Sequence, residues 1–569
     1  MGSLLALLSY AKAASRTCQH VKGAYGDVIT VSSLSQVPDA LLGEMEIPLL
    51  SRTVAALLAL LFIRRLLRRY LEYRSNKAFG DRHGCLPTSM LKNEMPLGLD
   101  RLKQIFDADA DSRLMELFLM HFRMWGNTLE QVFLAAQAFG TIDPINLEAM
   151  LSTKLKDFGM GPRRQTTFPF FGDGIFTQDG PDWKHSRELL RPQFSHKQYQ
   201  DLEIFREHVD NLIDNIPTNG GIVDLQPLFF RLTLDTTTAF LFGKSVCSLV
   251  GAGTSAGKTD FAEAFDTAQS YVAKRLRLLD LYWLIGGKEF RDSCAIVYKF
   301  MDEIIDRGLD LGETDDGQER HSRYVFLDVV AKDSRNRTAL RQQMIDILVA
   351  GRDTTALRHP RVLTKLREEI SSVVGGTSEM KRADLHKMAY LNNVLKESKS
   401  NGKIPNWERR THLLIKGIAL RLYPSVPVNV RTAQRTTFLP TGGGADGLSP
   451  VLIPSGANVA YSVYSMHRRP DFYGEDAEDF RPERWEEDLG LFRDETTSKW
   501  GYLPFNGGPR ICLGMDFALT EAAYAVVRIL QRFPIVKMPP DEVRVKTGKE
   551  RQTMTLVLSA TDGCKVQFG

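Results

Sequence analysis

The feature that most constrains this chain is a loop that places one cysteine directly before a long amphipathic helix. Residues 505–514 read Phe-Asn-Gly-Gly-Pro-Arg-Ile-Cys-Leu-Gly, and the two glycines and the proline favour a tight, irregular turn. An amphipathic pattern then runs from about Met515 to Phe533 and stops at Pro534. At such a junction, backbone N–H groups and the positive helix end favour thiolate over thiol. We interpret Cys512 as a thiolate ligand to iron, where it would help to cleave a bound O–O bond.

The spacing Phe505-x-x-Gly508-x-Arg510-x-Cys512-x-Gly514 resembles the haem-binding signature of the cytochrome P450 family. The string 504–524 is similar to fungal alkane and fatty-acid hydroxylases of that family, and the similarity runs from about residue 78 to the C-terminus. The resemblance implies haem b (iron protoporphyrin IX) with Cys512 as its proximal ligand, Phe505 packed nearby and Arg510 on a haem propionate. Gly514 would let the backbone lie close to a flat macrocycle.

Two other stretches carry candidate haem contacts. Trp183 and Arg187 are one helical turn apart, so both can lie on one face of a helix. Their indole N–H and guanidinium could each reach a haem propionate, although the same pattern suits an amphipathic helix with a structural tryptophan. Pro427-Val-Asn-Val-Arg431 resembles the family strand whose arginine also binds a propionate.

A helical pattern over 340–356 ends in a carboxyl beside a hydroxyl. Gly351 weakens the helix and leaves space for dioxygen. Oxygen activation needs two protons at the distal oxygen, and Asp353 with Thr354 forms an acid–alcohol pair suited to deliver them. The alternative is a helix that merely ends on a capping Asp-Thr. The resemblance implies that Thr354 is the oxygen-activating threonine and Asp353 its acidic partner.

Composition and periodicity favour a large, mainly helical protein. The chain has 569 residues, of which 43% are hydrophobic and 25% charged, and its formal charge of +4 gives no indication of a nucleic-acid role. Six scattered cysteines form neither a CxxC metal site nor a disulfide framework, which favours a reducing compartment. Helical patterns dominate from about 100 to 420, and strand-like alternation appears in 426–432 and 451–459. We therefore predict a mainly α, P450-like fold with a smaller β-rich part.

The N-terminal segment 1–75 is predicted to hold a membrane anchor at about 47–63. This run is mostly apolar, although a bilayer crossing needs roughly 20 apolar residues. Residues 64–69, Arg-Arg-Leu-Leu-Arg-Arg, favour the cytoplasmic side and contact with anionic headgroups. A buried core helix with a solvated basic end is the alternative. We expect a haem-thiolate monooxygenase domain over 76–569 that faces the cytoplasm from the endoplasmic reticulum membrane.

Two places depart from the family pattern. Glu397 should be followed three residues later by arginine, but Leu420-Arg421 resumes only after an intrusion, 398–419. Codons at both ends of the intrusion can carry splice signals, and splicing would restore Glu-Thr-Leu-Arg, so we hypothesise a retained, in-frame intron. The helix of Thr354 also meets Pro360 too soon, because proline disfavours helix at its predecessor. We predict that about ten residues, roughly 15 Å of helix, are missing after 356.

The resemblance leads to two further expectations, a structural motif and a redox partner. Residues 480–485, Phe-Arg-Pro-Glu-Arg-Trp, resemble the aromatic–arginine motif that holds the cysteine loop against a Glu-x-x-Arg helix. Neither a nicotinamide nor a flavin signature is present, so we expect electrons from an NADPH-cytochrome P450 reductase. Lys184, Arg187 and Arg191, with Lys197 beyond, could attract an acidic partner or simply form a solvated helix face.

The expected substrate is a hydrophobic small molecule. Phe168-Pro-Phe170-Phe171 matches the position of a family substrate loop, and Val426, Val428 and Val430 would flank the pocket, although aromatic runs are more often core. Each CH₂ of an alkyl chain buried there gains about 0.8 kcal/mol. We expect insertion of one oxygen atom of O₂ into n-alkanes or fatty acids, at or near the chain end. Other hydrophobic substrates and a non-catalytic or misfolded product of a faulty gene model remain open, whereas Asp353-Thr354 argues against a peroxide-using enzyme.

Overall fold

The computed structural model describes most of the chain after the first 48 residues. The described ranges are 49–133, 136–194, 199–200, 202–243, 245–250, 256–310, 336–351, 360–375, 379–396, 420–540 and 550–569. Asp353, Thr354, Lys197 and the intrusion 398–419 lie outside them, as does the predicted deletion after 356. The chain divides into two units, Met1–Arg74 and Ser75–Gly569.

Helices make up most of the described residues, as the periodicity predicted. Their bounds are α2 (Leu49–Arg82), α3 (Leu99–Ala110), α4 (Leu114–Trp125), α5 (Pro144–Glu148), α6 (Arg163–Phe171), α7 (Gly180–Leu190), α8 (Glu203–Asp214), α9 (Leu225–Phe242), α10 (Ala256–Arg277), α11 (Lys288–Asp310), α13 (Arg337–Gly351), α14 (Pro360–Val373), α15 (Arg382–Lys387), α16 (Ala389–Lys396), α17 (Val463–Met466), α18 (Pro470–Tyr473), α19 (Glu495–Trp500) and α20 (Met515–Arg532). Among the helices described, none is both long enough and apolar enough to cross a membrane. The anchor at 47–63 therefore stays a prediction.

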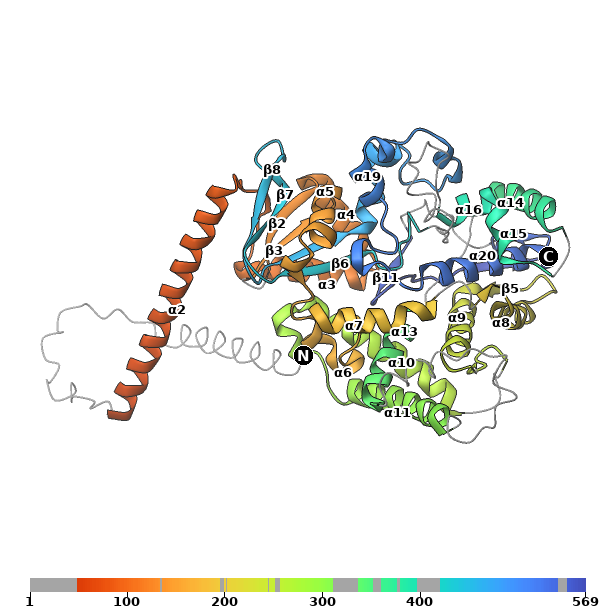
Figure 1. Ribbon diagram of the computed structural model, residues 1–569, viewed down its shortest axis with the longest axis horizontal. Coiled ribbons are helices and arrows are strands. Elements are labelled where there is room, and N and C mark those ends of the chain that lie inside the picture. The colour runs from red at the N-terminus through yellow and green to blue at the C-terminus, as the bar shows by residue number, and fades with distance from the viewer. Residues whose placement is uncertain are drawn as a thin grey trace, which may run out of the picture. The chain divides into compact units, whose positions relative to one another are not determined.

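The strands form a smaller β-rich part; Figure 1 shows β2, β3, β6, β7 and β8 gathered away from α8–α11, whereas β5 lies beside α8 and α9. Their bounds are β1 (Ser89–Leu91), β2 (Thr128–Phe133), β3 (Ala136–Thr141), β4 (Phe158–Gly159), β5 (Ile222–Asp224), β6 (Val428–Ala433), β7 (Thr437–Gly443), β8 (Ser449–Ile453), β9 (Asn458–Ser462), β10 (Val536–Lys537), β11 (Gln552–Met554), β12 (Leu558–Ala560) and β13 (Lys565–Phe568). Six of them make one sheet in the order β1-β2-β3-β9-β6-β4, in which Arg431 of β6 pairs with Val459 of antiparallel β9. The predicted alternation at 451–459 proves to be two strands, because Pro454 and Gly456 (φ +84°) turn the chain.

Two helices position the candidate site within the second unit. In α20, apolar side chains from Phe517 to Leu530 are buried in the larger hydrophobic core, and its bounds match the predicted Met515–Phe533 closely. α13 packs against α6, α9 and α11, and its described part ends at Gly351, two residues after the buried stretch 343–349. The segment after β9 winds through α17 and α18 to the cysteine loop and packs in a second core with the sheet.

Candidate cofactor site

The cysteine loop is held in one conformation by contacts from several elements. Its 3₁₀ turn, η13 (Gly508–Arg510), leads through Ile511 to Cys512, whose N–H donates to the carbonyl of Phe505 at 3.0 Å. Gly508 has φ +66°, and a Cβ there would lie 2.1 Å from the carbonyl oxygen of Leu151. Only glycine fits this approach, because a side chain would be both strained and in collision. Asn506 also has a positive φ and accepts a hydrogen bond from the Tyr461 hydroxyl at 3.0 Å.

The side chain of Cys512 faces an internal space. Its surface is accessible, yet burial by the surrounding protein raises the pKa of its thiol. The Gly514 N–H and the Arg187 charge act in the opposite direction but do not outweigh burial. The Gly514 N–H thus acts in the direction predicted from the helix end, although burial has the larger effect. A bound metal ion would favour the thiolate, since metal coordination deprotonates a thiol outright.

Three predicted haem contacts come together beside this space. The guanidinium of Arg510 lies 4.3 Å from the centre of a Trp183 ring, and that of Arg187 lies 5.9 Å from it. Arg510 also donates to Asp179 Oδ1 at 2.7 Å and to the carbonyl of Gln178 at 3.0 Å. The loop thus meets α7 where Arg510 lies over the Trp183 ring. Arg187 lies beside the same ring, as the helical spacing of Trp183 and Arg187 allowed.

A second pair of arginines adds to the positive charge. Arg431 on β6 is 2% exposed, and its Nε is buried without a hydrogen-bond partner. Arg163, the first residue of α6, donates to Asn429 Oδ1 at 2.5 Å, and Arg431 donates to the same atom at 3.1 Å. Burial and the charges of Arg431 and Arg510 lower the pKa of Arg163 to about 10. Such mutual repulsion suits an anionic partner with two carboxylates. Sequence reasoning missed Arg163, whose one signal is a basic pair at the start of a helix.

Other predicted residues are placed with less consequence. Phe505 is half-buried and contributes its carbonyl to the loop. A Cβ on Gly514 would meet only Phe194, at an ordinary 3.5 Å, so the protein itself does not require glycine there. The run predicted as a substrate loop is helical in α6, where Phe170 and Phe171 belong to the core and Phe168 is exposed. Those two rings are therefore packed in the core and do not lie in a loop.

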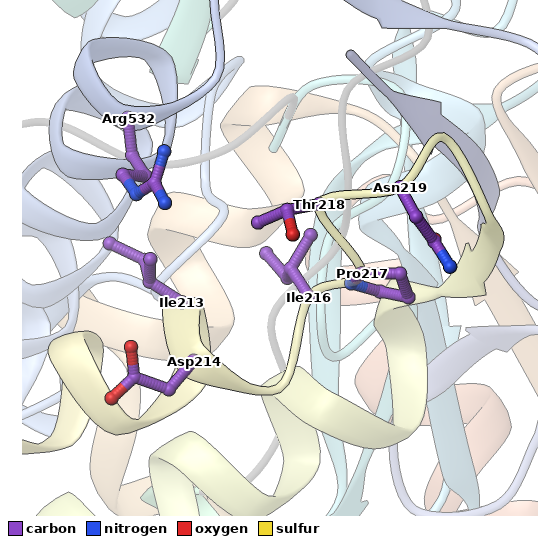
Figure 2. Close-up of a pocket in the computed structure, with 7 residues that line it drawn as sticks. All are labelled: Ile213, Asp214, Ile216, Pro217, Thr218, Asn219 and Arg532. Atoms are coloured by element: carbon purple, nitrogen blue, oxygen red, sulfur yellow. The ribbon is translucent and has the colours of Figure 1, made fainter.

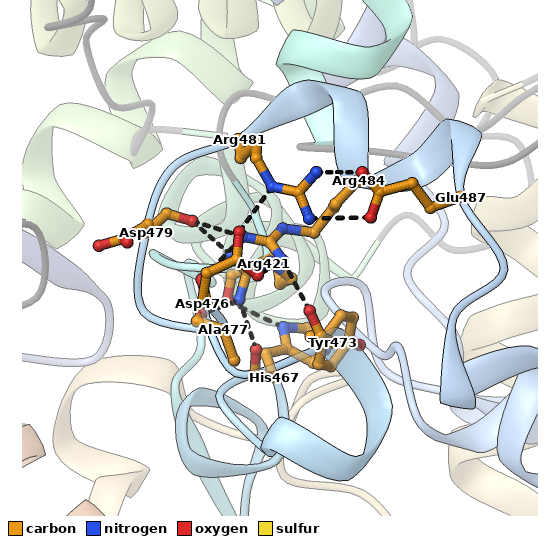
Figure 3. Close-up of polar contacts among 9 residues, drawn as sticks. All are labelled: Arg421, His467, Tyr473, Asp476, Ala477, Asp479, Arg481, Arg484 and Glu487. Atoms are coloured by element: carbon orange, nitrogen blue, oxygen red, sulfur yellow. Dashed lines mark hydrogen bonds and ion pairs between the residues drawn. The ribbon is translucent and has the colours of Figure 1, made fainter.

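Behind the loop lies a buried network centred on Arg421, drawn in Figure 3. Arg421 is fully buried and donates to the backbone carbonyls of His467 at 2.8 Å, of Asp479 at 3.0 Å and of Ala477. Arg484 is also fully buried and donates to the same Asp479 carbonyl at 2.9 Å. The residue that resumes the family pattern after the intrusion therefore occupies a fixed position.

The two arginines of the 480–485 motif have different surroundings. Arg484 donates to the Tyr473 carbonyl at 2.6 Å and to Asp476 Oδ1 at 2.7 Å. Arg481 is partly exposed and pairs with Asp476 at 2.6 Å and with Glu487 at 2.9 Å. The structural role expected of this motif thus falls on Arg484, because it shares a carbonyl with Arg421 (Figure 3).

A surface hollow of about 390 Å³ lies elsewhere, between the end of α8 and the end of α20 (Figure 2). Asp214, Thr218, Asn219 and Arg532 contribute its polar side chains. Arg532 is the last residue of α20, whereas Cys512 precedes its first, and 18 helical residues separate the two ends. At 1.5 Å per residue this is about 27 Å, so the hollow is not part of the cysteine site.

Comparison with known proteins agrees with this geometry. The family model described as Cytochrome P450 matches residues 113–398 and 419–566. A protein called "Cytochrome P450" from Arthroderma benhamiae is 42% identical over 536 residues, which cover 91% of this chain and 99% of the relative. Cytochrome P450 52A5 of Candida maltosa is 42% identical over 78% of this chain and 82% of its own length. A crystal structure of cytochrome P450DA heme domain shares the fold, with a TM-score of 0.66 at 20% identity over 85% of this chain and 98% of that one.

These matches place the chain in a class of haem enzymes defined by one cysteine loop. The chain belongs to the cytochrome P450 family, and it resembles the fungal members of that family. It is a monooxygenase, and its cofactor is haem b. The residues around Cys512 fit this group, because they combine one sulfur donor with an excess of arginine facing an internal space.

Proposed function

We propose that Cys512 holds the haem iron and that Trp183, Arg187, Arg431 and Arg510 hold its propionates. The observation that carries the proposal is the meeting of a cysteine at the start of α20 with these cations around one internal space. Arg163 joins them, since its pKa and that of Arg510 are both lowered to about 10 by burial and by Arg431. Anionic carboxylates would relieve this repulsion.

The bound haem supplies the chemistry that activates dioxygen and inserts one of its oxygen atoms into a substrate. In our proposal Asp353 and Thr354 pass protons toward that oxygen, as a carboxyl beside a hydroxyl can. Phe505 and Gly514 flank the sulfur. The arginines would hold the carboxylates of the ring and neutralise their charge.

Replacement of Cys512 tests this assignment. We expect C512A to lose the absorption of thiolate-ligated, carbon monoxide-bound ferrous haem, while C247A, which removes another exposed cysteine, keeps it. Thermal unfolding of both variants shows whether the fold persists. An unaltered spectrum in C512A would remove the proposal.

We propose n-alkanes or fatty acids as substrates, hydroxylated at or near the chain end. Support comes from the resemblance to fungal hydroxylases and from two exposed apolar side chains among those predicted to meet the substrate, Phe168 on α6 and Val426 before β6. The test is product analysis with purified protein, NADPH-cytochrome P450 reductase and substrates of graded chain length. Conversion of other hydrophobic compounds alone would replace this substrate class, and turnover with peroxide but without reductase would favour a peroxide-using enzyme.

We propose that the chain works on the endoplasmic reticulum membrane, facing the cytoplasm. Support comes from large apolar side chains that are exposed at two places. One is α2, where Leu57, Leu61 and Phe62 are each about 60% exposed; the other is the turn η7 (Leu279–Leu284), where Trp283 is 65% exposed. Flotation with vesicles of phosphatidylcholine and phosphatidylserine tests the lipid contact. Recovery of all protein in the vesicle-free fraction contradicts it.

We propose that the segment 398–419 is a retained intron and that residues are missing after 356. The family match supports the first point, because it leaves out 399–418 and resumes just before Arg421. Arg421 is fully buried among backbone carbonyls, as expected if the mature chain joins it closely to Glu397. Sequencing of the transcript tests both points. Haem content of the full chain and of the spliced form then separates a working enzyme from a non-catalytic or misfolded product.

A further inference from the structure

His467 lies between the Arg421 network and the start of the cysteine loop. It is fully buried, and its Nε2 accepts a hydrogen bond from the backbone N–H of Leu503 at 2.9 Å. Its Nδ1 lies 3.1 Å from the carbonyl oxygen of Arg421. Leu503 stands two residues before Phe505, whose carbonyl receives the N–H of Cys512.

These two contacts fix the proton of the imidazole. Because Nε2 accepts from an N–H, it carries no proton, so Nδ1 must be the donor to the carbonyl of Arg421. Arg421 returns a hydrogen bond to the His467 carbonyl at 2.8 Å. The two residues are therefore joined reciprocally, and the ring is stacked on Tyr502 with the planes 25° apart. One neutral tautomer satisfies every polar atom of this side chain.

We propose that His467 is a positioning residue that fixes the cysteine loop by accepting a hydrogen bond from the backbone N–H of Leu503. The inference rests on the proposed role of Cys512 as the haem ligand. The chain of contacts runs from Arg421 through His467 and Leu503 to Phe505 and Cys512. It differs from simple core packing, because it depends on an acceptor at the ε position of the ring and not only on the volume of the ring.

Substitution of His467 by glutamine or by asparagine tests the two ring nitrogens separately. The side-chain amide of H467Q reaches the ε position and can still accept from Leu503, whereas that of H467N reaches only the δ position and can still donate to Arg421. We expect H467N to raise the hydrogen-exchange rate of the peptide that contains Leu503 about tenfold, while H467Q leaves it close to that of the unaltered chain. This measurement uses the full chain and requires neither substrate nor activity.

A second buried histidine serves as the matched control. His208 of α8 is 3% exposed and lies in the helical core, and burial lowers its pKa as it does that of His467. We expect H208Q to change exchange in α8 and not around Leu503. Equal exchange in H467N and the unaltered chain overturns the proposal, as does equal acceleration in H467N and H467Q, because ring packing would then explain the effect. Acceleration around Leu503 in H208Q also overturns it.

The haem-loaded protein gives an independent readout. We expect H467N to lose the carbon monoxide spectrum of thiolate-ligated iron on mild warming sooner than H467Q does. If C512A fails to alter that spectrum, the haem assignment fails, while the exchange experiment still reports whether His467 holds the loop. A stable spectrum in H467N together with unchanged exchange would leave His467 as an ordinary core residue.

Discussion

The two sides of the site are held in different ways. On the sulfur side, Arg421 and Arg484 donate mainly to backbone carbonyls, and Gly508 fits closely against the backbone of Leu151. On the α13 side, the loop between α6 and α7 meets the helix through one carboxyl, since Asp346 Oδ2 accepts from the Phe176 N–H at 3.0 Å. Its Oδ1 is buried without a hydrogen-bond partner.

This difference indicates which side of the site tolerates amino-acid substitution. Backbone carbonyls are present whatever the neighbouring side chains are, so the sulfur side depends on a few arginines and glycines. The α13 side depends on side chains that can be exchanged, such as Gln343, which donates to Ser186 at 2.8 Å. We therefore expect substitutions on the sulfur side to cost more free energy of unfolding than equally buried substitutions on the α13 side.

The largest effect is expected for R421A. It removes a donor from three backbone carbonyls, of which that of Asp479 still accepts from Arg484, and we expect a loss of about 4 kcal/mol in the free energy of unfolding, or no folded protein. R435A is the control, because Arg435 is 68% exposed in its pair with Asp157 and should contribute less than about 1 kcal/mol. Urea unfolding checks both variants. Similar losses for the two would erase the contrast.

The next effect concerns pH and Glu521 on α20, the helix that follows Cys512. Burial raises the pKa of Glu521 from 4.5 to about 7, although the hydroxyl of Thr236 opposes this shift. Between these values the unfolded chain ionises first, so the folded state loses stability as pH rises from 4.5 to 7. We expect E521Q to equal the unaltered chain below pH 4.5 and to exceed it by about 3 kcal/mol at pH 7. A constant difference between the two chains across this range would contradict the shift.

The next prediction concerns Gly508 and tests the sulfur side of the site alone. G508A combines a φ of +66° with a Cβ 2.1 Å from a carbonyl oxygen, and we expect a loss of at least about 2 kcal/mol. G447A has a similar φ of +70° with nothing within 4 Å, so it should lose only about 1 kcal/mol. Thermal unfolding measures the two side by side. If G447A proves as costly, backbone strain and not the contact with Leu151 governs the loop.

The smallest effect is expected for D346N on the α13 side. Burial raises the pKa of Asp346 well above its usual range, so the folded state holds it protonated and an amide replaces it with little loss, less than about 1 kcal/mol. D346L leaves the Phe176 N–H unpaired and should cost about 1–3 kcal/mol. Unfolding experiments at pH 7 compare the two. A large loss in D346N would mean that the carboxylate form is the one that holds the loop.

Sequence patterns foretold the parts of this molecule that depend on local spacing. The turn before Cys512, the bounds of α20 and the shared face of Trp183 and Arg187 all follow from residues close together in the chain. The roles of Arg163 and His467 could not be predicted, because each depends on partners far away in the sequence: Arg163 donates to Asn429, and His467 accepts from Leu503. The rise in the pKa of the Cys512 thiol could not be predicted for the same reason, since burial comes from elements that the local pattern does not include.

The Arg421 contacts close a loop that begins after the intrusion. The carbonyls that Arg421 binds lie 46 to 58 positions further along the chain, so the segment that must be drawn together runs from Arg421 to Asp479. Loop-closure entropy depends on the residues inside the loop, and it grows only slowly with their number. Residues added upstream of Arg421 do not lengthen this loop. A chain that contains residues 398–419 and a chain that lacks them therefore meet the same entropic cost in forming these hydrogen bonds.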